Sequence, residues 1–186
     1  MPLAALQQAL AHLYTDERAR ARFRSDPEAF ARSFELAPAE LAQLSSIGEA
    51  RLHVYCDSLD RKRANECART LPLSAAAFGP LFRREFVRYA RKVPLGAGAR
   101  RYRDDAAAFA TFLSRSAGVG VCAPAFTLLR FEANFGCGVR FYRYFVPDLA
   151  RLAARGDSIE TAEAVATLVV RFLGRTFALR FPSRAR

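Results

Sequence analysis

The sequence predicts an α+β fold in which an N-terminal multi-helix domain precedes a small three-stranded antiparallel β-sheet region. Helix start signals and apolar residues spaced three and four positions apart recur through the first part of the chain, whereas later stretches alternate apolar and polar residues. A joint rich in glycine, Gly118–Pro124, separates these two textures. We therefore expect a helical domain at residues 1–117 and a β-rich C-terminal region at residues 118–186.

The first part of the chain predicts short helices and then a long one. One apolar helical stripe is formed by Leu3, Leu6, Leu10 and Leu13. Further helices are expected to begin at Thr15, as the cap before Asp16 and Glu17, at Asp26-Pro27 and at Pro38, because a capping residue or a first-turn proline favours a helix start. A long helix is expected from Glu49 to Thr70, ended by Pro72.

The middle of the chain predicts three further helices. Ser74 is expected to cap the first, which Gly79-Pro80 kinks. Asp104-Asp105 opens the second, which runs through Leu113. Ala125–Phe135 fits a helix or a strand, and the spacing of its apolar residues favours the helix.

The last part of the chain predicts the sheet. Three stretches are predicted to be strands: Val139–Phe145, Val165–Phe172 and Thr176–Phe181. Gly174 marks the bend of a hairpin between the last two, and a helical turn at Asp148–Arg155 is stopped by Gly156. Strands this close in sequence indicate one small antiparallel sheet.

An edge of this sheet is a candidate peptide-binding site. Arg140, Tyr142 and Tyr144 are expected on one face of the first strand, with Val139, Phe141 and Phe145 on the other. An exposed edge accepts an extended peptide as an additional strand, so we assign Arg140, Tyr142 and Tyr144 to peptide binding. An edge covered by the chain's own helices explains the pattern equally well.

The positive charge is concentrated in the middle of the chain. The net charge is +11, and residues 61–103 hold 12 basic and 2 acidic residues. Such a segment favours an acidic partner, such as a nucleic acid or an acidic protein face. The expected contact residues are Arg61, Arg63, Arg83, Arg84 and Arg88. A solvated helix face is an equally good interpretation.

The sequence offers few groups for catalysis. His53 and Cys56 lie three apart on a helix, but two ligands make a weak metal site. No C-x-x-C pair, phosphate-binding loop or nucleophile motif is present. We expect no catalytic residue, no metal and no cofactor, and therefore no enzyme. With neither a membrane-length apolar run nor an export signal, we expect a cytoplasmic protein and no membrane partner.

A set of spaced motifs resembles a known family. The motifs are Leu13–Asp16, Arg22-Phe23, Asp26-Pro27, Arg51–Leu59, Lys62-Arg63, Leu71-Pro72, Phe78-Gly79, Phe82, Tyr89, Pro94, Phe109 and Phe112-Leu113. Over roughly residues 10–115 the chain resembles the helical partner proteins of multinuclear non-haem iron oxidases. Those oxidases are TIM-barrel enzymes that modify cysteines in ribosomally made peptides, as in the methanobactin and thiaglutamate pathways.

The resemblance implies a non-catalytic accessory subunit of an oxidase complex. Such a subunit binds the leader of a ribosomally made precursor peptide and docks on the oxidase as a heterodimer, while the iron belongs to the oxidase. We expect a methanobactin-type pathway, with the leader adding a strand to the C-terminal sheet. The alternative is a basic helical nucleic-acid-binding protein that uses residues 61–103, although no recognition-helix motif is evident there.

Overall fold

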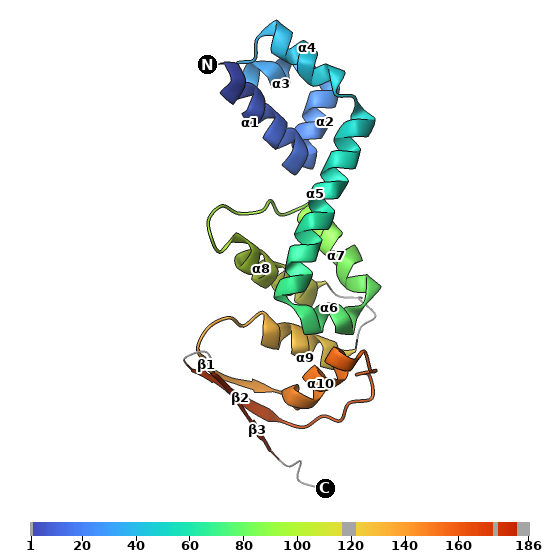
Figure 1. The fold of residues 1–186 in the computed structure, drawn as a ribbon, viewed down its shortest axis with the longest axis vertical. Coiled ribbons are helices and arrows are strands. Elements are labelled where there is room, and N and C mark those ends of the chain that lie inside the picture. The colour runs from blue at the N-terminus through green and yellow to red at the C-terminus, as the bar shows by residue number, and fades with distance from the viewer. Residues whose placement is uncertain (1, 117–121, 173–174, 182–186) are drawn as a thin grey trace. The chain divides into compact units, whose positions relative to one another are not determined.

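The chain is mostly helical, with one small sheet near its C-terminus, as expected for an α+β fold. The computed structural model describes residues 2–116, 122–172 and 175–181 (Figure 1). The helices in these ranges are α1 (Pro2–Thr15), α2 (Glu17–Ser25), α3 (Pro27–Ser33), α4 (Pro38–Ser46), α5 (Glu49–Thr70), α6 (Pro72–Phe78), α7 (Pro80–Ala90), α8 (Arg101–Arg115), α9 (Ala123–Glu132) and α10 (Val146–Arg155). The strands are β1 (Gly138–Tyr142), β2 (Thr167–Phe172) and β3 (Arg175–Arg180).

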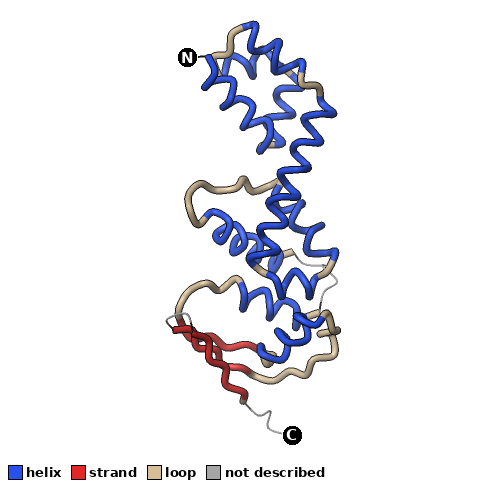
Figure 2. Tube along the Cα trace, viewed as in Figure 1, coloured by secondary structure: helices blue, strands red, loops and turns tan. Residues whose placement is uncertain are grey.

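The chain divides into two compact units. The first comprises Met1–Ala64 and Val87–Leu95, and the second comprises Asn65–Phe86 and Gly96–Arg186. Figure 2 shows the strands, in red, gathered into one sheet, which belongs to the second unit. The boundary expected between residues 117 and 118 lies outside the described residues.

The first unit packs short capped helices around a small apolar core. Its buried residues are Ala9, Leu13, Ala19, Phe30 and Leu44. Asp26 is an N-cap, as predicted, and its carboxylate accepts a hydrogen bond from the backbone N–H of Ala29 at 2.8 Å. The expected cap Thr15 is instead the last residue of α1, and Asp16 caps α2 by accepting from the backbone N–H of Arg18 at 2.8 Å. Each bond satisfies a helix-end donor that would otherwise lack a partner within the helix.

The helices of the second unit pack through aromatic rings. The Phe109 ring of α8 meets the rings of Phe82 and Phe86 of α7 edge-on, with centroids 5.1 and 5.0 Å apart. Phe78 of α6 meets Phe126 of α9 at 5.4 Å in the same way. Edge-to-face pairs of this kind stabilise a core beyond the area that they bury.

Two predictions about α6 and α7 are corrected. Gly79, at a φ of 53°, ends α6, so Gly79-Pro80 separates two helices and does not kink one. Helix α6 begins at Pro72, before Ser74, and the side chain of its N-cap residue, Leu71, accepts no capping hydrogen bond. The Glu132 carboxylate of α9 supplies the cap instead, accepting the N–H groups of Leu73 at 2.9 Å and Ser74 at 2.6 Å.

The sheet has the strand order β1-β2-β3, and both pairings are antiparallel. Strand β1 is shorter than the predicted Val139–Phe145, because Phe145 is the N-cap of α10 and Pro147 occupies its first turn. Tyr144 and Phe145 therefore lie beyond the strand. The bend expected at Gly174 falls outside the described residues. Gly156 ends α10 at a φ of 75°, as predicted.

We predict that Glu132→Gln destabilises the second unit by about 2 kcal/mol, because one carboxylate oxygen that caps α6 is lost. Denaturant unfolding monitored by circular dichroism measures this change. The control is Glu163→Gln, an exposed glutamate of the same unit. Equal stability of the two variants would contradict a capping role for Glu132.

Candidate functional site

One face of the sheet is closed by the chain itself. Tyr142 and Val169 form a buried cluster with Val146 of α10, and Phe131 and Ala178 pack against it. The Tyr142 and Phe131 rings meet edge-on with centroids 6.1 Å apart. Burial raises the pKa of the Tyr142 hydroxyl, partly offset by nearby arginines, of which Arg140 is the strongest. This inner face fixes the sheet against α9 and α10.

Arginines anchor the loop that leads into β1. Arg103 of α8 donates to the Phe135 carbonyl at 2.6 Å, and its guanidinium lies 4.7 Å from the centre of the Phe135 ring. Arg171 of β2 donates to the Asn134 carbonyl and lies 4.3 Å from the centre of the Phe131 ring. These contacts hold the entry to β1 at a fixed place in the second unit.

The three residues assigned to peptide binding lie in different surroundings. Arg140 is exposed on β1, whereas the side chain of Tyr142 is in the inner core, with 7% of the residue exposed. Tyr144 is half-buried beyond the strand end, and its carbonyl accepts a hydrogen bond from the Thr167 hydroxyl at 2.7 Å. The peptide-binding role of these residues stays a prediction, and the exposure of Arg140 makes its side chain the most accessible of the three.

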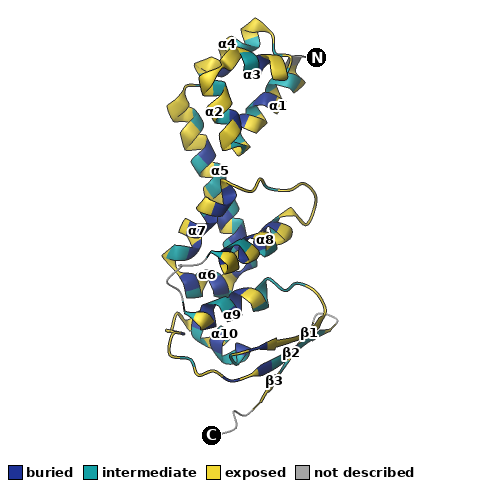
Figure 3. Ribbon diagram, turned by 180° about the vertical axis from the view of Figure 1, so that it is seen from behind, coloured by how far each residue is buried: buried dark blue, intermediate teal, exposed yellow. Residues whose placement is uncertain are grey.

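The opposite, outer face of the sheet is apolar and exposed. Because cross-strand partners share a face, the register places two rows there: Val139, Val170 and Phe177, and Phe141, Leu168 and Leu179. Phe172 continues the alternation of β2, and Phe181 follows β3. In Figure 3, β1 and β3 are largely yellow, the colour of exposed residues. This surface, defined by these eight residues, is called the outer apolar face below.

Four phenylalanines contribute most of this exposed surface. The exposed fractions are 71% for Phe141, 62% for Phe172, 56% for Phe177 and 44% for Phe181. At roughly 200 Å² for a whole phenylalanine, these fractions leave about 470 Å² in water. Val139 and Leu179 enlarge the patch further. It reaches the upper part of the range of about 300–600 Å² for the largest patch of a typical monomer, a size that often marks an interaction surface.

The charges on the sheet have one sign. The three strands contain Arg140, Arg171, Arg175 and Arg180 and no acidic residue. Arg171 is held by the contacts described above, and Arg180 lies 5.4 Å from the centre of the Phe145 ring. Arg175 is paired with Phe172 across β2 and β3, so it lies on the outer apolar face. The register places the other three arginines on the inner face, so Arg175 is the strand charge that favours a negatively charged partner at the outer apolar face.

One of the predicted contact residues in the first unit, Arg63, has a structural role. Arg63 of α5 donates to the carbonyls of Val93 at 2.8 Å and Ala90 at 3.4 Å, where it satisfies groups at the end of α7. Arg61 donates to the Asp57 carbonyl of its own helix at 3.2 Å. Arg88 is exposed on α7. Arg63 thus joins α5 to α7, a role that the sequence did not reveal.

The other two predicted contact residues belong to the second unit. Arg83 donates to the Asn65 side chain at 3.1 Å, and Arg84 lies 3.5 Å from the Glu85 carboxylate. Both arginines are exposed. They lie next to each other on α7, and their role in binding an acidic partner stays a prediction.

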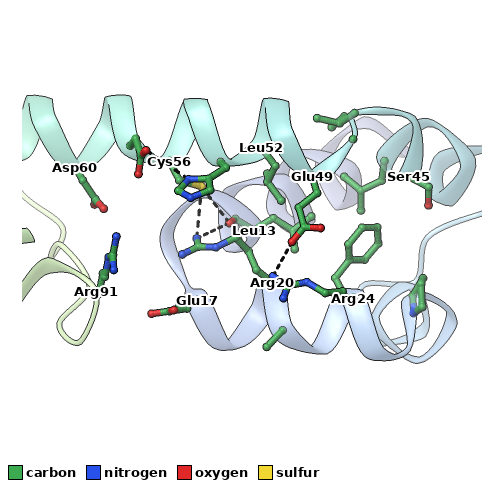
Figure 4. Close-up of a pocket in the computed structure, with 18 residues that line it drawn as sticks. Leu13, Glu17, Arg20, Arg24, Ser45, Glu49, Leu52, Cys56, Asp60 and Arg91 are labelled. Atoms are coloured by element: carbon green, nitrogen blue, oxygen red, sulfur yellow. Dashed lines mark hydrogen bonds and ion pairs between the residues drawn. The ribbon is translucent and has the colours of Figure 1, made fainter. Parts of the chain in front are cut away.

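The first unit contains a hollow of about 490 Å³ between α2 and α5 (Figure 4). Arg20 crosses it and donates to the Leu13 carbonyl at 2.9 Å and to the Cys56 sulfur at 3.5 Å. Burial raises the pKa of the Cys56 thiol, which disfavours the nucleophilic thiolate.

Metal ligands do not converge in the part of the chain that the structure describes. No group of three or more His, Cys, Asp or Glu residues there could hold a metal ion. His53 lies 3.4 Å from Asp57, one turn along α5. The same described residues include no helix with the length and hydropathy needed to cross a bilayer.

A comparison with protein-family models gives a match. Residues 45–115 match the family model described as "SCO6045-like, C-terminal domain". This stretch runs from the end of α4 to the end of α8 and lies before the sheet. A search of the curated proteins found no match.

Sequence reasoning missed the outer apolar face as a surface. The period-two signal was visible in all three strands, but apolar residues occupy both faces of the sheet. Which face is covered depends on where α9 and α10 pack, and no local pattern encodes that. The exposed phenylalanines of β2 and β3 were therefore read as ordinary strand residues.

We predict that Asp60→Asn stabilises the folded chain at pH 7. Burial raises the pKa of Asp60 above its ordinary 3.8, against the opposing effect of Arg63, Arg91 and Arg20. Figure 4 shows Asp60 and Arg91 across from each other. Above pH 3.8 the folded protein holds the Asp60 proton more tightly than the unfolded chain does, so stability falls as the pH rises through the raised pKa.

The free energy of unfolding of Asp60→Asn is therefore expected to exceed that of the natural chain by an amount that grows between pH 3.8 and neutrality. Urea unfolding across this pH range measures it. Asp57→Asn, a change to the neighbouring carboxylate on α5, is the control. If Asp60→Asn is less stable than the natural chain at pH 7, the attraction between the Asp60 carboxylate and the arginines is stronger than the cost of burying that charge.

Proposed function

We propose that this chain is a non-catalytic, cytoplasmic accessory subunit that binds the leader of a ribosomally made precursor peptide. It presents a cysteine of that peptide to a partner, a TIM-barrel multinuclear iron oxidase of the methanobactin type. The observation that carries the proposal is a three-stranded sheet whose outer strands, β1 and β3, pair on one side only among the described residues.

The leader adds as a fourth strand along β1. Four of the five β1 residues are exposed, and the loop before the strand is fixed by Arg103 and Arg171. A preformed edge of this kind donates and accepts backbone hydrogen bonds without first paying for its own ordering. Arg140 stands on this strand and attracts carboxylates of the leader.

Binding the leader serves a catalytic partner by proximity. A peptide held by its leader has a high effective concentration at the partner's active site, without any new chemistry in the accessory subunit. The exposed Arg83 and Arg84 offer a second contact to an acidic face of that partner.

The experiment is recovery of the tagged chain from its native cells at moderate salt, followed by mass spectrometry. We expect a TIM-barrel iron protein together with a short cysteine-containing peptide. Recovery of nucleic acid alone would contradict the proposal. If that nucleic acid is also lost as the salt concentration rises, the result favours the nucleic-acid-binding alternative.

A pair of proline variants locates the peptide. Adjacent backbone N–H groups of a strand point to opposite sides, so one of Val139→Pro and Arg140→Pro removes a donor from the open edge of β1. The other removes a donor that faces β2. We expect one variant to stay folded and lose the peptide, and the other to lose stability. Tyr142 is unsuitable for this test because its side chain lies in the core.

Thermal unfolding of both variants accompanies the recovery experiment. A folded edge variant that recovers the peptide as well as the natural chain does would place the leader elsewhere. If both variants unfold, amide hydrogen exchange of the natural chain decides whether the leader binds at β1. In that case slower exchange in β1 on peptide addition supports the site, and unchanged exchange contradicts it.

A further inference from the structure

The outer apolar face is a surface that strand addition at the edge does not use. An added strand bonds to the backbone of β1, whereas the outer apolar face is made of side chains that stand perpendicular to the sheet. Its four phenylalanines are between 44% and 71% exposed. Exposing apolar side chains to water is unfavourable, so covering them with a partner stabilises the complex.

We propose that the outer apolar face docks an amphipathic helix of an acidic partner protein, with apolar residues on the contact side and carboxylates beside them. The proposal does not depend on the leader. It rests on the exposed apolar area of the face, on the spacing of its strands and residue rows, and on its charge.

The dimensions of the sheet match one helix. Strands lie about 4.8 Å apart, so β1 and β3 are separated by roughly 10 Å, close to the diameter of a helix with its side chains. The two cross-strand rows are two residues apart along each strand, or about 6.6 Å. A helix with apolar residues at positions i, i+3, i+4 and i+7 therefore contacts both rows.

The charge selects the partner. The strands hold no acidic residue, and of their four arginines the register places Arg175 on the outer apolar face and the other three on the inner face. Two copies of this chain joined face to face would each bring Arg175 to the contact, with no strand carboxylate to pair with it. A helix flanked by glutamates instead places its carboxylates near Arg175. The charge pattern thus disfavours a second copy and favours an acidic helix.

Two synthetic peptides test the proposal with the whole chain. Both are 18-residue amphipathic helices with the same leucine face, and the polar face carries glutamates in one and lysines in the other. Binding is measured by fluorescence anisotropy of labelled peptide. We expect the glutamate peptide to bind, and the lysine peptide to bind at least about tenfold more weakly.

Variants map the site. Phe141→Ser combined with Phe177→Ser is expected to weaken binding of the glutamate peptide at least about tenfold, because two of the four exposed phenylalanines are removed. Leu3→Ser, which changes a residue that is 65% exposed in the first unit, is the matched control and is expected to have no effect. Thermal unfolding checks that each variant is folded.

A charge reversal gives a readout that does not depend on stability. Arg175→Glu is expected to reduce the preference for the glutamate peptide over the lysine peptide, whereas Arg155→Glu, on α10, is not. Equal binding of both peptides to the natural chain would overturn the acidic partner. Binding insensitive to the sheet variants would overturn the site. A dimer in sedimentation that Phe141→Ser with Phe177→Ser dissolves would assign the face to a second copy.

Discussion

The packing of Val146 of α10 against Tyr142 and Val169 on the inner face of the sheet is the contact on which both proposed interaction surfaces depend. Side chains of a strand alternate between faces, so burying Tyr142 and Val169 under α9 and α10 directs their neighbours outward. A register slip of one residue would exchange the two faces. The exposure of Phe141 and Phe177 is thus a direct consequence of one small buried cluster.

The sheet offers two chemically different surfaces. The edge of β1 presents backbone donors and acceptors, which suit an extended peptide of varied sequence. The outer apolar face presents phenylalanine side chains, which suit a structured partner with a complementary apolar side. A subunit that holds a substrate peptide and also binds a catalytic partner needs both kinds of surface. The two proposals are therefore compatible within one sheet, and each has its own test.

Local signals predicted much of the fold. The bounds of α5 were predicted as Glu49–Thr70, and Asp26-Pro27 marked the start of α3, because capping and proline act on adjacent residues. The cap of α6 was missed because Glu132 lies 58 residues from Ser74 in sequence. The burial of Tyr142 was missed for the same reason: its cover comes from α9 and α10. Long-range packing decides both features, and a single sequence does not encode it locally.

The central claim is that the sheet is where this chain meets its partners. Amide hydrogen exchange of the chain alone, compared with the chain recovered with its native partners, tests this claim most directly. The account predicts slower exchange at residues 138–142, 167–172 and 175–180, with residues 3–46 unchanged. Protection confined to residues 3–46 or 61–92, with the strands unaffected, would contradict it.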